Sequence, residues 1–382
     1  MRVRGQILAA AAGAAVLALT FMFAASDDLR FLVRAAYEEG RILLRRRPID
    51  ELIADPEVPA ARKEQLRLVR EAREFAVREL GLAAGQTYTH FSDVGRDTLL
   101  LVLSASPGDK LEEYLWRFPV VGAFPYKGFF DLAAARHEAR RLEQRGFDTY
   151  LRPAPAFSTL GWFPDPLLST ALSADPVQLV ATVLHEIAHN TLFVKGRVAF
   201  NESFASFVGY RGAERFFGLK GDSALAARAG AIWRDEKKLG EFFRALADTL
   251  EVIYALTAPA DSILGLKRRI FDTAKRCLAE ELAGGFEVYD PSRLARGPFN
   301  NARLVAALVY RTGLDLFDRV LSSAEGDLRS AIALIVRSAP APNDGDPFEA
   351  LAALSYPAGA PPPQLCSVRS CRRRFATLCS AP

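Results

Sequence analysis

Two histidines and a glutamate stand at a spacing that is typical of metal-activated hydrolases. The segment "HEIAH" puts His185 and His189 four residues apart, with Glu186 directly after the first. On a helix, residues four apart lie one turn from each other on the same face, so both imidazoles can bind one ion. Glu186 would lie beside that ion and could take a proton from a water molecule held there. The pattern predicts a zinc site with one ion per chain and Glu186 as its catalytic base.

A catalytic zinc also needs a third protein ligand and one open position. Glu202, in the segment "FNESFASF", is the strongest candidate for that ligand. Twelve residues separate it from His189, which is enough chain to reverse and bring a second helix alongside the first. The neighbouring Asn201 and the small Ala205 favour this interpretation, because close helix approach needs small residues.

Other interpretations of these residues stay open. Glu202 could be a first-turn carboxylate favoured by the helix dipole. The remaining histidines offer weaker ligands: His137 lies on a charged helix face in "AAARHEARR", and His90 has no partner pattern. The whole segment could also belong to a structural helical protein that binds no metal.

The elements that must position the site are mostly helical. Asp175 and Pro176 form a strong helix start, with a capping carboxylate followed by proline at the first helical position. The fold class is therefore α+β and predominantly helical, with a small, mostly antiparallel sheet before the helical part. Helices are expected at about residues 60–80, 131–146, 175–194, 201–217, 222–257, 260–284, 300–323 and 325–338.

The domain boundaries follow from the same patterns. We expect a helical N-terminal segment at 28–86 and a domain that carries the predicted metal site at 87–340, with its sheet at 87–165 and its helices at 175–340. Residues 341–382 are rich in proline and read as a poorly ordered tail.

The first 27 residues predict export from the cytoplasm. Arg2 and Arg4 precede 19 residues without a charge, and Asp27 ends the run. This pattern is typical of a membrane anchor or a cleaved signal peptide. In an exported protein, three cysteines crowded in the tail indicate one or two disulfides; these candidates are Cys366, Cys371 and Cys379.

Composition excludes one class of partner. The chain of 382 residues carries 49 basic and 45 acidic side chains, a net charge of +4. No Lys/Arg block with interleaved aromatics is present, so the sequence does not predict binding to nucleic acid. Half of its residues are hydrophobic, which indicates a globular protein.

The motifs resemble those of known metallopeptidases. "HEIAH" followed by "NESFASF" resembles the glutamate-type zincins. Seven motifs in one order resemble the bacterial predicted aminopeptidase family over about residues 35–325; they are "RPIDELIADP", "REFAVRELGL", "WRFPVVGAFPYKGFF", "AFSTLGWFPDPLLST", "HEIAH", "FNESFA" and "NNARLVAALVY". The resemblance implies that His185, His189 and Glu202 bind zinc and that Glu186 is the base.

The chain departs from that family at two points. Members commonly carry a lipoprotein-type cysteine near the N-terminus, and this chain has none before Cys277, which favours a membrane helix over lipid attachment. Phe157 stands where the family has a tyrosine, so a hydroxyl at that position is not essential here. The expected location is the bacterial cell envelope, either anchored in the inner membrane and facing the periplasm or released into the periplasm.

The predicted activity is zinc-dependent peptide hydrolysis. It would be an aminopeptidase by resemblance, while the absence of a recognisable amine-binding acid leaves endopeptidase action open. Tyr310 and Tyr126 are candidate donors to the oxyanion. An edge strand would bind the extended peptide substrate; its residues would be Ser158, Thr159, Leu160, Gly161 and Trp162. The alternative function is a zinc-containing, catalytically inactive protein of the envelope that binds peptides as a chaperone does.

Overall fold

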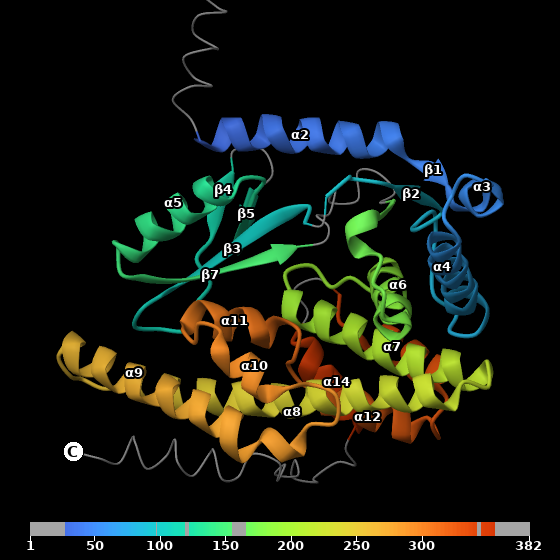
Figure 1. Ribbon diagram of the computed structural model, residues 1–382. Coiled ribbons are helices and arrows are strands. Elements are labelled where there is room, and N and C mark those ends of the chain that lie inside the picture. The colour runs from blue at the N-terminus through green and yellow to red at the C-terminus, as the bar shows by residue number, and fades with distance from the viewer. Residues whose placement is uncertain (1–26, 97, 119–121, 155–165, 342–344, 356–382) are drawn as a thin grey trace, which may run out of the picture.

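The structure is a computed structural model in which most of the chain between residues 27 and 355 is described. The fold is predominantly helical with small sheets, as predicted from the sequence (Figure 1). Among the described helices, none is long and apolar enough to cross a membrane. The predicted anchor or signal segment, the predicted substrate strand Ser158–Trp162 and the three tail cysteines lie outside the described residues, which are 27–96, 98–118, 122–154, 166–341 and 345–355.

Within the described residues, the strands form three small sheets and not the single sheet that was predicted. The largest has β3 (Leu100–Pro107) at its centre, antiparallel to β6 (Tyr126–Phe129) on one side and β7 (Phe147–Ala154) on the other. The short β2 (His90–Ser92) is not part of that sheet; it pairs with β1 (Arg47–Pro48) and, in parallel, with β8 (Leu167–Leu168). The remaining described strands, β4 (Trp116–Phe118) and β5 (Gly122–Phe124), pair with each other.

Three long helices form the centre of the helical part. They are α6 (Pro176–Thr191), α7 (Val198–Leu219) and α8 (Ser223–Tyr254), and α7 lies between the other two. The remaining helices are α2 (Asp27–Arg45), α3 (Ile49–Ala54), α4 (Ala60–Arg78), α5 (Leu132–Glu143), α9 (Ala260–Arg276), α10 (Pro291–Arg296), α11 (Asn301–Val309), α12 (Leu314–Ser323), α13 (Leu328–Ser338) and α14 (Pro347–Ser355), with short η1 (Ser169–Ala171), η2 (Cys277–Glu281) and η3 (Ala283–Gly285) segments.

The predicted start of α6 is confirmed. The Asp175 carboxylate accepts hydrogen bonds from the backbone amides of Val177 and Gln178, at 2.9 and 3.4 Å, and Pro176 occupies the first turn. An ion pair at 2.6 Å with Arg228 of α8 holds the same carboxylate from the other side. One aspartate therefore both caps the helix that carries the two histidines and ties it to α8.

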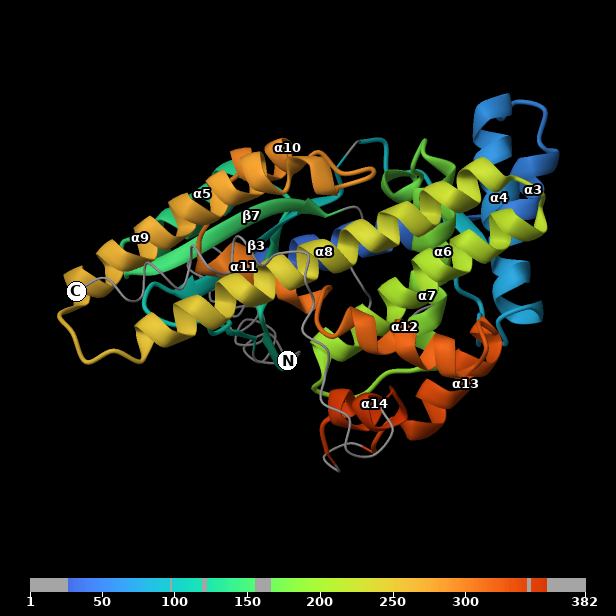
Figure 2. The ribbon, with the colours of Figure 1, turned by 90° about the horizontal axis from the view of Figure 1, so that it is seen from below.

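Helix α8 belongs to two hydrophobic cores. Its first half contributes Ile232 and Trp233 to the core that α4, α6 and α7 share, and its second half contributes Phe242 and Leu246 to a core built with α9 and α11. Its 32 residues correspond to about 48 Å at the rise of an α-helix. Seen from below in Figure 2, α8 runs past α7 and on beside α9 and α11.

Two predictions about the C-terminal part are wrong. Residues 300–323 are not one helix but two, because Gly313 adopts a left-handed backbone with φ of 63° between α11 and α12. The tail predicted to be poorly ordered from residue 341 contains α14, whose Leu351 is 1% exposed in the core beside α12. The apolar residues in "PFEALAALS" lie on one side of this helix and pack against the core. The proline-rich sequence around them made the helix hard to predict.

Candidate metal centre

Three side chains from α6 and α7 converge on one point. The Nε2 atoms of His185 and His189 are 3.2 Å apart. The carboxylate of Glu202 is 3.3 Å from Nε2 of His185 and 3.7 Å from Nε2 of His189. All three candidate ligand atoms lie within 4.8 Å of one another, and each side chain is partly buried. The structure thus brings together the three residues that the sequence suggested as ligands.

These separations fit a small tetrahedral ion. Zinc binds imidazole nitrogen and carboxylate oxygen at about 2.0–2.2 Å, so two ligand atoms of a tetrahedral site lie about 3.4 Å apart. The separations here, from 3.2 to 3.7 Å, match that edge. Two histidines and one glutamate leave the fourth position open, which is the ligand count of catalytic zinc sites.

Glycines on α7 allow it to press against α6. A Cβ atom at Gly209 would come within 2.7 Å of the Ala181 carbonyl oxygen and 3.5 Å of the His185 Cβ atom. At Gly212 it would come within 2.6 Å of the Leu184 side chain. Ala205, the small residue noted in the sequence, is fully buried at the same interface, but the two glycines set the closest approach.

Asn201 fixes the loop that carries the chain from α6 to α7. Its side chain accepts a hydrogen bond from the Val194 amide and donates one to the Val194 carbonyl oxygen, both at 2.9 Å. Asn201 is 2% exposed, so these two bonds are made in the protein interior. They hold the first turn of α7, where Glu202 follows directly, at a set position relative to the end of α6.

Replacing Asn201 with alanine is expected to destabilise this loop. Each buried polar group left without a partner costs about 1–3 kcal/mol, so the loss of both bonds to Val194 is expected to lower the free energy of unfolding by about 2–4 kcal/mol. Denaturant unfolding of metal-free wild-type and Asn201→Ala protein measures this difference. A loss below about 0.5 kcal/mol would contradict the role assigned to Asn201.

The two histidines have opposite electrostatic environments. Burial lowers the pKa of His189 to about 4, and the neighbouring His185 adds to this effect while Glu202 opposes it. Burial also acts to lower the pKa of His185, but the hydrogen bond to Glu202 and the charges of Glu186 and Glu202 outweigh it and raise that pKa. Burial acts to raise the pKa of Glu202, yet its hydrogen bond with His185 and the charges of both histidines leave it lowered.

In the metal-free protein the two imidazoles should therefore titrate separately. As the pH falls, we expect His185 to gain its proton above pH 6.5 and His189 to stay neutral until about pH 4. The stabilising contribution of His185 is present below pH 6.5 and is lost as the pH rises through its folded pKa. His189 has the opposite effect. Between pH 6.5 and about 4, His189 is protonated in the unfolded chain but neutral in the folded protein, so the free energy of unfolding decreases as the pH is lowered through this range. Histidine NMR titration of metal-free protein measures both, and similar midpoints would contradict this assignment.

A second group of side chains, from the sheet and the end of α11, interacts electrostatically with Glu202. Burial and the charge of Glu202 raise the pKa of Tyr310 to about 12, and the neighbouring Arg152 guanidinium partly opposes this rise. Burial and Glu202 likewise raise the pKa of Tyr126, again opposed by Arg152. The charge of Glu202 thus affects the pKa values of both tyrosines that were suggested as oxyanion donors. Both remain protonated at neutral pH and can donate a hydrogen bond.

Tyr310 is held in place through the two residues that follow it in the chain. The Arg311 guanidinium pairs with Glu236 of α8 at 2.6 Å, and the Thr312 amide donates to the Ser203 hydroxyl at 3.2 Å. Gly240 allows α8 to touch this segment, because a Cβ there would lie 2.7 Å from the Arg311 carbonyl oxygen. Ser203 follows Glu202 directly, so the same contacts that place Tyr310 also link it to the triad.

Of the other residues noted in the sequence, Glu186 lies beside the triad, and its charge acts on His185. Glu186 is exposed on α6 directly after His185. His137 is exposed on α5, as predicted, and the ring of His90 in β2 contacts the Thr89 hydroxyl at 2.9 Å. Cys277, which the sequence did not single out for a disulfide, is disulfide-bonded.

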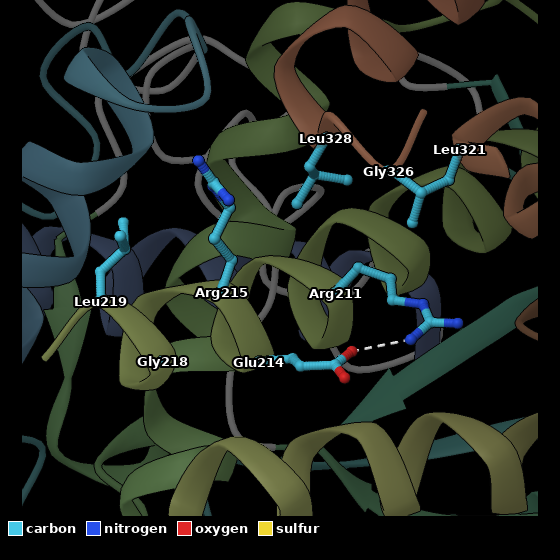
Figure 3. A pocket seen from close by; sticks show the side chains of 8 residues that line it. All are labelled: Arg211, Glu214, Arg215, Gly218, Leu219, Leu321, Gly326 and Leu328. Atoms are coloured by element: carbon cyan, nitrogen blue, oxygen red, sulfur yellow. Dashed lines mark hydrogen bonds and ion pairs between the residues drawn. The ribbon is translucent and has the colours of Figure 1, made fainter. Parts of the chain in front are cut away.

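A surface pocket of about 350 Å³ lies along the second half of α7. Figure 3 shows Arg211 directed at Glu214, both among the residues that line this pocket. Arg211 also pairs with Asp318 at 2.8 Å, so its charge is already neutralised. None of the triad residues lines this pocket, and no chemistry follows from it.

Comparison with known proteins gives one match. A family model with the description "Putative aminopeptidase" matches residues 30–344. No curated protein and no solved structure matches the chain. The matched range contains the triad, Arg152 and both tyrosines.

Proposed function

The chain belongs to the putative aminopeptidase family, and from this premise we propose that it is a zinc-dependent peptidase. The observation that carries the proposal is the convergence of His185, His189 and Glu202 at separations that fit one tetrahedral ion. The donor set supports zinc, because imidazole and carboxylate together suit this ion and leave a position open for chemistry.

In the proposed mechanism, His185, His189 and Glu202 would hold the metal. When bound, zinc supplies Lewis acidity, which polarises the scissile carbonyl and the attacking water. Glu186 accepts the proton of that water and delivers it to the nitrogen of the leaving amine. Its exposed position beside His185 leaves it accessible to both partners.

Tyr310 and Tyr126 supply the electrostatic part of the mechanism. Their hydroxyls stay protonated, so each can donate to the oxygen on which negative charge develops. Tyr310 has the firmer position, since Arg311 and Thr312 hold it from both α8 and α7. Tyr126 is 44% exposed on the edge strand β6 and is the less constrained donor.

The experiment that tests this proposal is a peptide-library digest with zinc-loaded wild-type and Glu186→Gln protein side by side. Mass spectrometry of the products gives both the fact of cleavage and the end of the peptide at which it occurs. Cleavage at N-terminal residues would support an aminopeptidase, and internal cleavage would support an endopeptidase.

A further inference from the structure

Arg152 lies next to the triad without a carboxylate partner of its own. Arg152 hydrogen-bonds the Tyr310 side chain and its charge acts on Glu202, but within the described residues no carboxylate lies at ion-pair distance from it, whereas Glu202 is engaged by both histidines. Arg152 is partly exposed near the end of β7. Other arginines of the fold, such as Arg211 and Arg311, are paired with acidic side chains. A guanidinium whose only described hydrogen bond is to a tyrosine hydroxyl keeps further N–H donors for an anionic ligand at the candidate metal site.

The strand register places Arg152 on the face of β7 that meets α11. Side chains alternate along a strand, so Asp148 and Arg152 share one face of β7. Asp148 accepts a hydrogen bond from the amide of Asn301, the first residue of α11, at 2.8 Å. From there α11 and β7 each advance about 13 Å, which brings Tyr310 at the end of α11 to Arg152.

Tyr126 completes this face from the opposite edge of the sheet. It pairs with Ser104 of β3, and Arg152 pairs with Val102, two residues away on the same side. Figure 1 shows the end of β7 directed toward α6 and α7. Arg152, Tyr310 and Tyr126 therefore form one polar group, and all three interact electrostatically with Glu202.

The charges of this region favour an anionic ligand. The carboxylates that act on the two histidines are Glu186 and Glu202, and the proposed mechanism uses both. Neither is then free to bind the ammonium group of a peptide. Two positive charges of a metal and one of Arg152 exceed the two negative charges of these glutamates.

We propose that Arg152 binds a carboxylate of the peptide substrate and so determines specificity at the proposed metal site; this inference rests on the proposed function. A guanidinium can donate two parallel hydrogen bonds to a carboxylate, which gives both affinity and orientation. The Tyr310 hydroxyl stands beside it as a further donor. The carboxylate can be the C-terminus of the peptide or an acidic side chain.

The test uses three peptides of one sequence: the free C-terminal acid, the C-terminal amide, and the amide with one internal glutamine replaced by glutamate. Fluorescence anisotropy with zinc-loaded Glu186→Gln protein gives dissociation constants without turnover, and kcat and KM are measured with the active enzyme. We expect a carboxylate peptide to bind about 10- to 100-fold more tightly than the plain amide. Tighter binding of the free acid would indicate that Arg152 binds the C-terminal carboxylate, and tighter binding of the glutamate peptide would indicate that it binds an acidic side chain.

Arg152→Gln, introduced into the same protein, is expected to reduce this preference to within about threefold, while Arg152→Lys keeps part of it. Arg140→Gln is the matched control, because Arg140 is exposed on α5 and carries the same charge. Equal binding of all three peptides by the parent protein, no binding of any, or a preference that survives Arg152→Gln would overturn the inference. If Arg152→Gln lowered kcat equally for all three peptides and left the ratio of their dissociation constants unchanged, this would also overturn the inference. Arg152 would then stabilise the oxyanion instead of binding a substrate carboxylate. Carboxylate-selective binding without any hydrolysis would refute the proposed function and leave this inference standing.

Discussion

The Glu186→Gln variant is expected to keep its zinc and to lose peptide hydrolysis by about 10²–10⁴-fold in kcat. Glutamine has nearly the same shape as glutamate but cannot accept the proton of the attacking water. Glu186 follows a metal ligand directly without belonging to the converging triad, so zinc content should stay at that of the wild type. Hydrolysis of the best library peptide, with zinc measured by elemental analysis on the same samples, checks both parts of the prediction.

The control for this variant is Glu79→Gln, the same chemical change at an exposed residue just after α4. It should leave turnover unchanged. Undiminished hydrolysis in Glu186→Gln would exclude Glu186 as the base. Peptide binding in the wild type without any cleavage would instead favour a binding protein that has lost turnover.

The second large effect is expected from removal of a ligand. His189→Ala and Glu202→Ala should each weaken zinc binding by more than about 100-fold, since losing a residue that only orients a ligand already costs 10–100-fold. Hydrolysis should disappear together with the metal. Competition with a chromogenic chelator measures the affinity, and elemental analysis gives the stoichiometry after dialysis.

His137→Ala is the matched control, because His137 is an exposed histidine on α5 far along the chain from the triad. It should bind zinc as the wild type does. Full zinc occupancy in Glu202→Ala would show that Glu202 only stabilises the first turn of α7. Full zinc occupancy in His189→Ala would show that zinc does not bind at the proposed site.

The sequence was most informative where local rules act alone. The cap at Asp175 and Pro176 and the four-residue spacing of the histidines both depend on a single helix, and the structure has that helix at Pro176–Thr191. The break at Gly313 was missed because residues 300–309 and 314–323 both have helical patterns, and only the backbone at one glycine separates them. The apolar face of α14 was hidden by prolines on both sides.

The parts of the site that depend on tertiary packing could not be predicted in the same way. Arg152 is one polar residue in a mixed strand, and only the alternation of Asp148, Tyr150 and Arg152 hinted at a polar face. Its place beside Tyr310 depends on α11 running along β7, a contact between residues about 150 positions apart in the chain. Likewise, Glu236 and Arg311 are 75 residues apart, and no local pattern links them.

Helix α8 has a consequence for how substrates can enter. It is anchored in both hydrophobic cores and contains no proline along its 32 residues, so it acts as a stiff rod between the half that carries the triad and the half that supports the sheet. A hinge motion between these halves would have to break backbone hydrogen bonds in the middle of α8 or strip one end from its core. We therefore expect the distance between the proposed metal ligands and Arg152 to be nearly the same before and after a peptide binds. That fixed distance would set how far the carboxylate of a bound peptide can lie from the scissile bond.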